Sequence, residues 1–241
     1  KALQFYDGLL TTDSASVETL MRKGHLHKSL KEYKKALNCF EALVAIQPEN
    51  SYFYQLAGQT ALEDPVFIGQ AIHYLNKALE LNPENEEVAI KLSNIYLEMR
   101  QAETASNLAH QFLKKDSSNI RMLLIDARAA YLQKDYKRVL AHAERINRAG
   151  DTINQSIKLQ AFSLYHLGRY EEAITWLKRM KDDQKAEQQY FYLSMANFRL
   201  NHLAKAEEYM QMAVNASVSP SLGDYYTQLG IVYEAEGKDR D

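Results

Sequence analysis

Residues 33–50 read YKKALNCFEALVAIQPEN, and this stretch decides the fold. Ala36, Phe40 and Leu43 are four and then three positions apart, which puts them on one face of an α-helix. Pro48 ends that helix, because proline lacks an amide hydrogen and clashes with the preceding helical turn. The stretch therefore predicts a helix with one buried face and a sharp end.

The small residue at position 36 recurs along the whole chain. Its counterparts are Ala2, Ala71, Ala105, Val139, Ala173 and Ala206. From Ala2 onward the gaps are 34, 35, 34, 34, 34 and 33 residues, and packing residues follow each small residue four and seven positions later. A constant period of this kind indicates a repeat architecture.

Each of these helices is the second helix of a repeat. The first helix of a repeat precedes it in the chain and carries its own small residue. The series is Gly24, Gly58, Ser93, Ala127, Ala161, Ser194 and Gly230. A small side chain is expected where one helix crosses its neighbour so closely that a larger one would push the two apart. In the turn between the paired helices of one repeat, Gly168 suits a left-handed cap that ends the first helix.

These features resemble the tetratricopeptide repeat family, whose pattern runs W-x2-L-G-x2-Y, then A-x3-F, then P. Ala36-x3-Phe40…Pro48 matches the second half of this pattern. The last copy of the first half reads Tyr226-x2-Leu229-Gly230-x2-Tyr233. The chain departs from the pattern at the consensus Trp, since Trp176 falls in a second helix. An extra residue also lies near positions 63–65.

The resemblance implies an all-α fold, a right-handed α-solenoid superhelix of helix–turn–helix repeats with about 14 helices. Residues 1–11 are expected to be the second helix of a truncated repeat, and residues 223–241 the first helix of another. Six full repeats are expected at 17–50, 51–85, 86–119, 120–153, 154–186 and 187–222. Because neither end has a polar cap, the chain is interpreted as a slice of a longer array.

Composition excludes several classes of function. The 29 Lys and Arg against 31 Asp and Glu give a net charge of −2, so we expect no nucleic-acid partner. No apolar run approaches the roughly 18 residues of a membrane span. The single cysteine, Cys39, excludes an internal disulfide framework and a cysteine zinc site. The compartment stays open between cytoplasm and periplasm.

Motifs for catalysis are not found in the sequence. The seven histidines form no H-E-x-x-H pair, the glycines form no phosphate-binding loop, and no G-x-S-x-G nucleophile elbow occurs. We therefore expect no enzyme activity, no metal and no cofactor in this chain.

The resemblance also implies that the first helices line a concave wall. In the second half of the chain this wall interleaves aromatic residues with cations, which are the residue types that dominate binding hot spots. The candidate peptide-binding groove comprises Arg121, Arg128, Tyr131, Lys158, Phe162, Tyr165, His166, Phe191, Phe198 and Arg199. The cations favour an acidic partner. The competing interpretation is that these aromatics pack against the adjacent repeat and belong to the core.

Two functions follow as hypotheses. The first is a non-catalytic scaffold that binds a partner protein or peptide in the groove. The second is a regulatory or substrate-recruiting arm of a larger enzyme or signalling protein. Self-association through the uncapped ends is compatible with either function.

Overall fold

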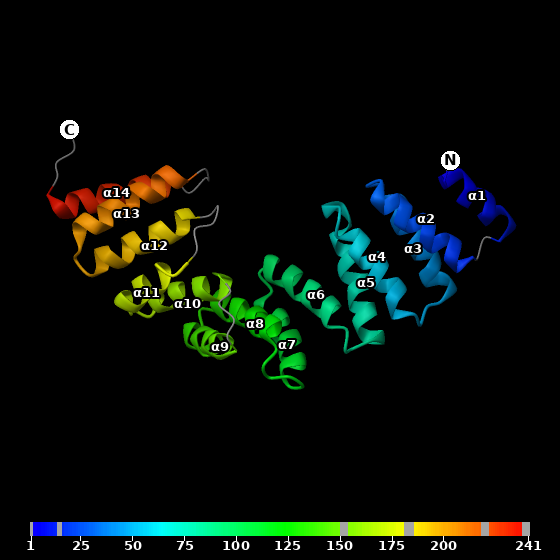
Figure 1. Ribbon diagram of the computed structural model, residues 1–241, viewed down its shortest axis with the longest axis horizontal. Coiled ribbons are helices and arrows are strands. Elements are labelled where there is room, and N and C mark those ends of the chain that lie inside the picture. The colour runs from blue at the N-terminus through cyan, green and yellow to red at the C-terminus, as the bar shows by residue number, and fades with distance from the viewer. Residues whose placement is uncertain (1, 14–15, 150–153, 181–185, 218–221, 238–241) are drawn as a thin grey trace. The chain divides into compact units, whose positions relative to one another are not determined.

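The computed structural model describes residues 2–13, 16–149, 154–180, 186–217 and 222–237 (Figure 1). These ranges contain fourteen α-helices, one short 3-10 helix and no strand, so the predicted all-α class is confirmed. None of these helices is both long enough and apolar enough to cross a bilayer. Parts of four connections predicted between repeats, at positions 14–15, 150–153, 181–185 and 218–221, lie outside the described residues.

The chain divides into two compact units, residues 1–112 and 113–241. The helices of unit 1 are α1 (Ala2–Thr12), α2 (Val17–Ser29), α3 (Tyr33–Ile46), α4 (Ser51–Ala61), η1 (Pro65–Phe67), α5 (Ile68–Leu81), α6 (Glu86–Glu98) and α7 (Ala102–Leu113, whose last residue belongs to unit 2). The helices of unit 2 are α8 (Ile120–Leu132), α9 (Tyr136–Arg148), α10 (Asn154–His166), α11 (Tyr170–Leu177), α12 (Ala186–Arg199), α13 (Leu203–Ala216) and α14 (Leu222–Glu236).

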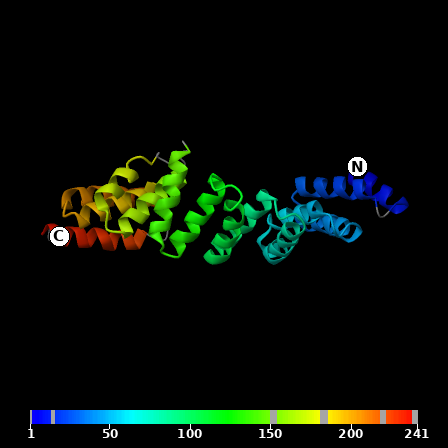
Figure 2. The same ribbon diagram turned by 90° about the horizontal axis from the view of Figure 1, so that it is seen from below.

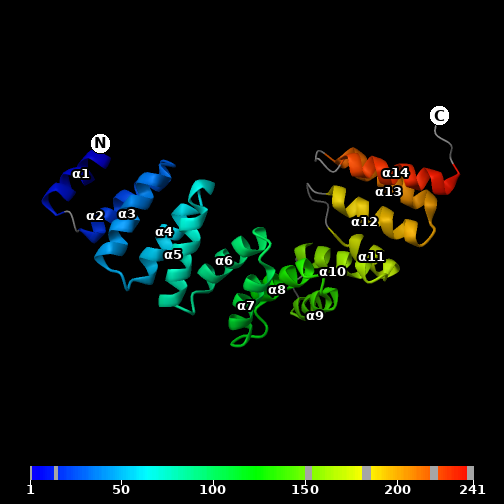
Figure 3. The same cartoon turned by 180° about the vertical axis from the view of Figure 1, so that it is seen from behind.

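Within each unit, consecutive helices pack as hairpins. In unit 1, α2 packs on α3 and α4 on α5; in unit 2, α8 packs on α9, α10 on α11 and α12 on α13 (Figure 3). α14 lies along α13, which Figure 2 shows as the red helix beside the orange one. In unit 2 the first helices also meet, α8 with α10 and α10 with α12. They therefore form one continuous wall.

The recurring small residues of the second helices are completely buried from the second copy onward. Ala36, Ala71, Ala105, Val139, Ala173 and Ala206 are all 0% exposed, as the period predicts. α1 differs, since Ala2 and Leu9 on its predicted packing face are exposed. Among the described helices α1 packs on α2, which leaves the other side of α1 uncovered.

The helix starts repeat with the same period. Asn50, Asn85 and Asn119 each cap a first helix, accepting a hydrogen bond from the backbone of Tyr52, Val88 and Met122 at 3.1, 3.2 and 3.1 Å. An asparagine at this position satisfies an amide group that the helix itself leaves unpaired. The caps therefore fix where each first helix begins.

Five first helices end in the same way, with one residue in the left-handed conformation. Lys31, Arg100, Lys134, Gly168 and Asn201 have φ between 59° and 76°. The next residue then donates to the carbonyl five positions earlier, as Asp135 does to Ala130 and Arg169 to Leu164, both at 2.9 Å. The left-handed cap predicted at Gly168 is confirmed. In the α4–α5 connection, where the extra residue falls, the 3-10 helix Pro65–Phe67 takes the place of this turn.

Lys134 holds its left-handed conformation at a cost of about 1–2 kcal/mol, because its Cβ crowds the following carbonyl. Replacing Lys134 by glycine removes this cost but adds flexibility to the unfolded chain. We expect Lys134→Gly to raise the free energy of unfolding by about 0.5–1 kcal/mol in urea denaturation, and Gly168→Ala to lower it by a similar amount. The same sign for both variants would contradict this account.

The close crossings predicted at Gly24 and Gly58 are present. A Cβ atom added to Gly58 would lie 2.7 Å from Cγ of Leu75 and 3.2 Å from its backbone nitrogen. A Cβ added to Gly24 would lie 2.7 Å from the ring of Phe40. Leu75 and Phe40 are both 0% exposed, so neither can swing away into solvent.

Gly58→Ala tests this crossing against Gly69→Ala in the neighbouring helix α5, where an added Cβ meets nothing within 4 Å. Alanine favours a helix over glycine by about 1 kcal/mol, and overpacking costs about 1–3 kcal/mol. We expect Gly58→Ala to lower the thermal unfolding midpoint and Gly69→Ala to leave it unchanged or raise it. Equal shifts of the unfolding midpoint in the two variants would show that the α4–α5 crossing can accommodate a methyl group.

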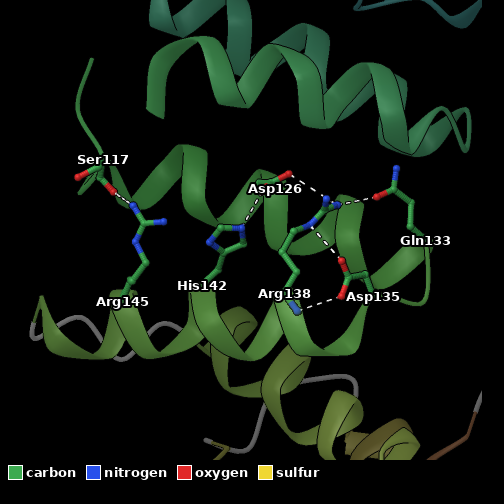
Figure 4. A network of polar contacts seen from close by, with 7 residues as sticks. All are labelled: Ser117, Asp126, Gln133, Asp135, Arg138, His142 and Arg145. Carbon is green, nitrogen blue, oxygen red and sulfur yellow. Dashed lines mark hydrogen bonds and ion pairs between the residues drawn. The ribbon is translucent and has the colours of Figure 1, made fainter. Parts of the chain in front are cut away.

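A buried polar pair joins α8 to α9 (Figure 4). His142 Nε2 lies 2.7 Å from Asp126 Oδ2; Asp126 is 0% exposed and His142 7%. The guanidinium of Arg138 approaches the other carboxylate oxygen at 3.9 Å, and Arg145 donates to the carbonyl of Ser117. Because both members of the pair are buried, a substrate could not reach them, and we assign the pair a structural role.

Removing His142 takes a hydrogen-bond partner from the buried carboxylate of Asp126 and so weakens the compensation for its burial. We expect His142→Leu to lower the free energy of unfolding by about 3 kcal/mol in urea denaturation. The double variant Asp126→Val/His142→Leu should lose less than His142→Leu alone, because it no longer buries a carboxylate. A larger loss in the double variant would mean that the pair itself stabilises the hairpin.

Candidate functional site

The wall of unit 2 contains a hollow of about 490 Å³. It is lined from four first helices: by Tyr131 of α8, by Lys158 and Phe162 of α10, by Gln188, Phe191 and Tyr192 of α12, and by Asp224, Tyr225 and Gln228 of α14. Five of these nine residues are aromatic. The hollow is therefore an apolar surface with a few polar groups, the usual make-up of a binding site.

The aromatic rings of the hollow are locked by one another. Phe162 stacks on Tyr192 with ring centroids 3.9 Å apart, and Phe191 lies 5.1 Å from Tyr225. Phe162 is 5% exposed and Tyr225 is 6% exposed, so their rings form the floor rather than the rim. Interlocked rings keep their shape without a ligand.

A junction of two phenols and one imidazole supports these rings from the side. The Tyr131 hydroxyl lies 3.3 Å from His166 Nε2 and 3.4 Å from the Tyr192 hydroxyl, and the ring of His166 stacks on Tyr136 at 4.8 Å. Burial raises the pKa of both phenols, and a hydrogen bond to Tyr192 raises that of Tyr131 further. Burial, and then Lys134, lowers the pKa of His166. The two phenols therefore keep their protons at pH 7, and the lowered pKa of His166 favours its neutral form.

Two opposite charges stand in the lining. The ammonium of Lys158 lies 5.5 Å from the ring centroid of Phe162, in cation–π geometry. Asp224 is exposed in the first turn of α14. The hollow thus has a cation on α10 and a carboxylate on α14.

The residues predicted for the groove fall into three groups. Tyr131, Lys158, Phe162 and Phe191 line the hollow. Two others stand beside it in the ring cluster, where Tyr165 lies 5.1 Å and His166 6.0 Å from the ring of Tyr192. The remaining four do not line it; these are Arg121, Arg128, Phe198 and Arg199.

The sequence-based list left out Gln188, Tyr192, Asp224, Tyr225 and Gln228. Part of the signal was present, because the predicted wall residues stand at fixed positions around each small residue; Arg121, for example, lies six positions before Ala127. The residues six positions before Ser194 and Gly230 are Gln188 and Asp224, which both line the hollow. The depth of Tyr225 in the floor has no counterpart in the period.

In unit 1, polar side chains on the first helices α4 and α6 form hydrogen bonds with one another. Gln59 donates to Glu87 at 2.9 Å, Asn85 donates to Gln55 at 2.8 Å, and Gln55 donates to Glu87 at 3.3 Å. These bonds join α4 to α6 and use the amide and carboxylate groups of the wall. Unit 2 therefore offers the better candidate site.

Within the described ranges, no three His, Cys, Asp or Glu side chains come together in a group that could hold a metal ion. The chemistry available at the hollow is that of apolar contact, hydrogen bonding and charge pairing.

Two models of the tetratricopeptide repeat match the sequence, one over residues 17–50 and one over residues 68–128. The chain is 24% identical over 174 residues to tetratricopeptide repeat protein 21A of Mus musculus. That match takes in 66% of this chain and spans 12% of the mouse protein.

Solved structures show the same fold at low sequence identity. A tetratricopeptide repeat protein from Parabacteroides merdae aligns with 95% of this chain and 90% of its own, at 12% identity and a TM-score of 0.61. PilW, a type IV pilus biogenesis factor, aligns with 87% of this chain and 98% of its own, at 14% identity and a TM-score of 0.67. At these identities the likeness supports the fold alone.

Proposed function

Since the chain is a tetratricopeptide repeat protein, a class of interaction scaffold, we propose that unit 2 binds an extended segment of a partner protein along its wall of first helices. The observation that carries the proposal is the hollow, where five aromatic residues meet a small number of polar groups. The segment places a large apolar side chain in this hollow.

The aromatic lining supports an apolar anchor. Burying one large apolar side chain contributes about 1.5–3 kcal/mol, and interface energy concentrates in central pockets lined by aromatic residues. Tyr192 is held by the ring of Phe162 and the hydroxyl of Tyr131, so little side-chain entropy is lost when a partner binds. The floor is formed in advance.

The sequence predicted an acidic partner from several cations on the wall, but fewer of these cations line the hollow. Lys158 lines the hollow, whereas Arg128 and Arg199 do not. We therefore propose one acidic side chain of the partner near Lys158, rather than a broadly acidic segment. Its contribution is that of a rim charge, which acts on the association rate and on specificity.

A second candidate function is the recruiting arm of a larger protein. The observation that favours it is the mouse relative, of which the chain spans 12% of the length. In that case the hollow would bind a substrate or a regulator of the larger protein, by the same contacts.

Blocking the hollow tests the proposal. The probe is a library of short random peptides displayed on phage and selected on the 241-residue chain. Gln188 is exposed on the rim, so Gln188→Trp should fill the hollow without disturbing the core. We expect the selected peptides to bind this variant at least about tenfold more weakly, a loss of about 1.4 kcal/mol.

The matched control is Gln155→Trp, at an exposed position of α10 outside the hollow, which should bind like the wild type. Circular dichroism melting of both variants checks that each is folded. Unchanged binding by folded Gln188→Trp would place recognition away from the hollow, and a library that yields no binder would contradict the proposed function.

A further inference from the structure

We propose that the hollow recognises the order of charges along its partner: an acidic side chain over α10, a large apolar side chain over α12 and a basic side chain over α14. This inference rests on the proposed function. It specifies the chemistry of the segment and the direction in which the segment lies. The occupant is a linear peptide segment of a partner protein in extended conformation.

The two charges of the lining stand at opposite sides of the aromatic floor. Lys158 comes from α10 and Asp224 from α14, while Phe191 and Tyr192 of the intervening α12 lie between them. Figures 1 and 3 show α12 between α10 and α14 in unit 2. A segment that crosses the three helices in sequence meets a cation first, then aromatic rings, then a carboxylate.

Asp224 is available to a partner. It is exposed, and within the described part of the chain it has no hydrogen-bond or ion-pair partner. Its place in the first turn of α14 complements the helix dipole, which accounts for an acidic residue there. Asp224 also lines the aromatic hollow. The helix dipole does not account for this second feature.

Lys158 is positioned for the opposite role. Its ammonium lies 5.5 Å from the ring centroid of Phe162, whose ring also stacks on Tyr192. The aliphatic stem of a lysine in such a place covers apolar surface while the charge stays near water. An acidic side chain that reaches the ammonium therefore brings the neighbouring residues of the segment onto the aromatic floor.

Helix spacing sets the length of the motif. Packed helix axes lie about 8–10 Å apart, so charges two helices apart are separated by about 16–20 Å. An extended chain advances about 3.3 Å per residue, which corresponds to about five or six residues. The expected motif is thus an acidic residue, a large apolar residue about three positions on, and a basic residue about three positions further, read in one direction.

Selection with charge-reversed variants tests the inference. The same displayed library is selected on the wild type, on Lys158→Glu, on Asp224→Lys and on the double variant. We expect wild-type binders to be enriched about twofold to fivefold in the acidic–apolar–basic order, as suits rim charges. Lys158→Glu should replace the acidic preference by a basic one, and Asp224→Lys should do the reverse at the other end. The double variant should select the inverted order.

Arg199→Glu is the matched control, because it reverses a charge in unit 2 outside the hollow. It should leave the selected motif unchanged. Wild-type binders that carry an apolar anchor but no charge order would overturn this inference and leave the proposed function standing. A charge order that survives both reversals would show that other residues recognise it. A library without any wild-type binder would contradict the proposed function itself.

Discussion

The close crossing of two helices at a small residue is the constraint on which this structure depends. Gly58 brings α4 against Leu75 of α5 so closely that even a methyl group would overlap. The second helices carry small residues that are wholly buried, from Ala36 to Ala206. A crossing this tight tolerates only small side chains, which accounts for the small residues that recur every 33 to 35 positions.

The fold was predictable because its determinants are local and periodic. A buried small residue, an asparagine cap and a left-handed turn each specify one point of a hairpin, and their spacing specifies the rest. The sequence did not foretell that Lys31, Arg100, Lys134 and Asn201 would adopt the conformation predicted only for Gly168. The backbone bond to the carbonyl five positions earlier holds them there, and residue preference alone does not reveal that bond.

The candidate site was less predictable than the fold, because a period gives the face of a helix but not the depth of a side chain. Phe162 was expected on the wall and lies in its floor, since Tyr192 stacks on it. The rings pack on one another and also line a hollow, and their role in binding a peptide stays a prediction. Lys158 lines the hollow, whereas Arg128 and Arg199 do not, a difference that the period alone does not reveal.

The assembly of the hollow from four helices has a thermodynamic consequence. In a repeat protein each helix is stabilised mainly by its neighbours, so one helix can detach locally while the rest stays folded. α14 contributes Asp224, Tyr225 and Gln228, and among the described helices it packs on α13. When α14 detaches, three of the nine lining residues leave together. Under the proposed function, the apparent affinity for a partner is the intrinsic affinity scaled by the fraction of molecules with α14 docked, so detachment of this one helix would weaken binding.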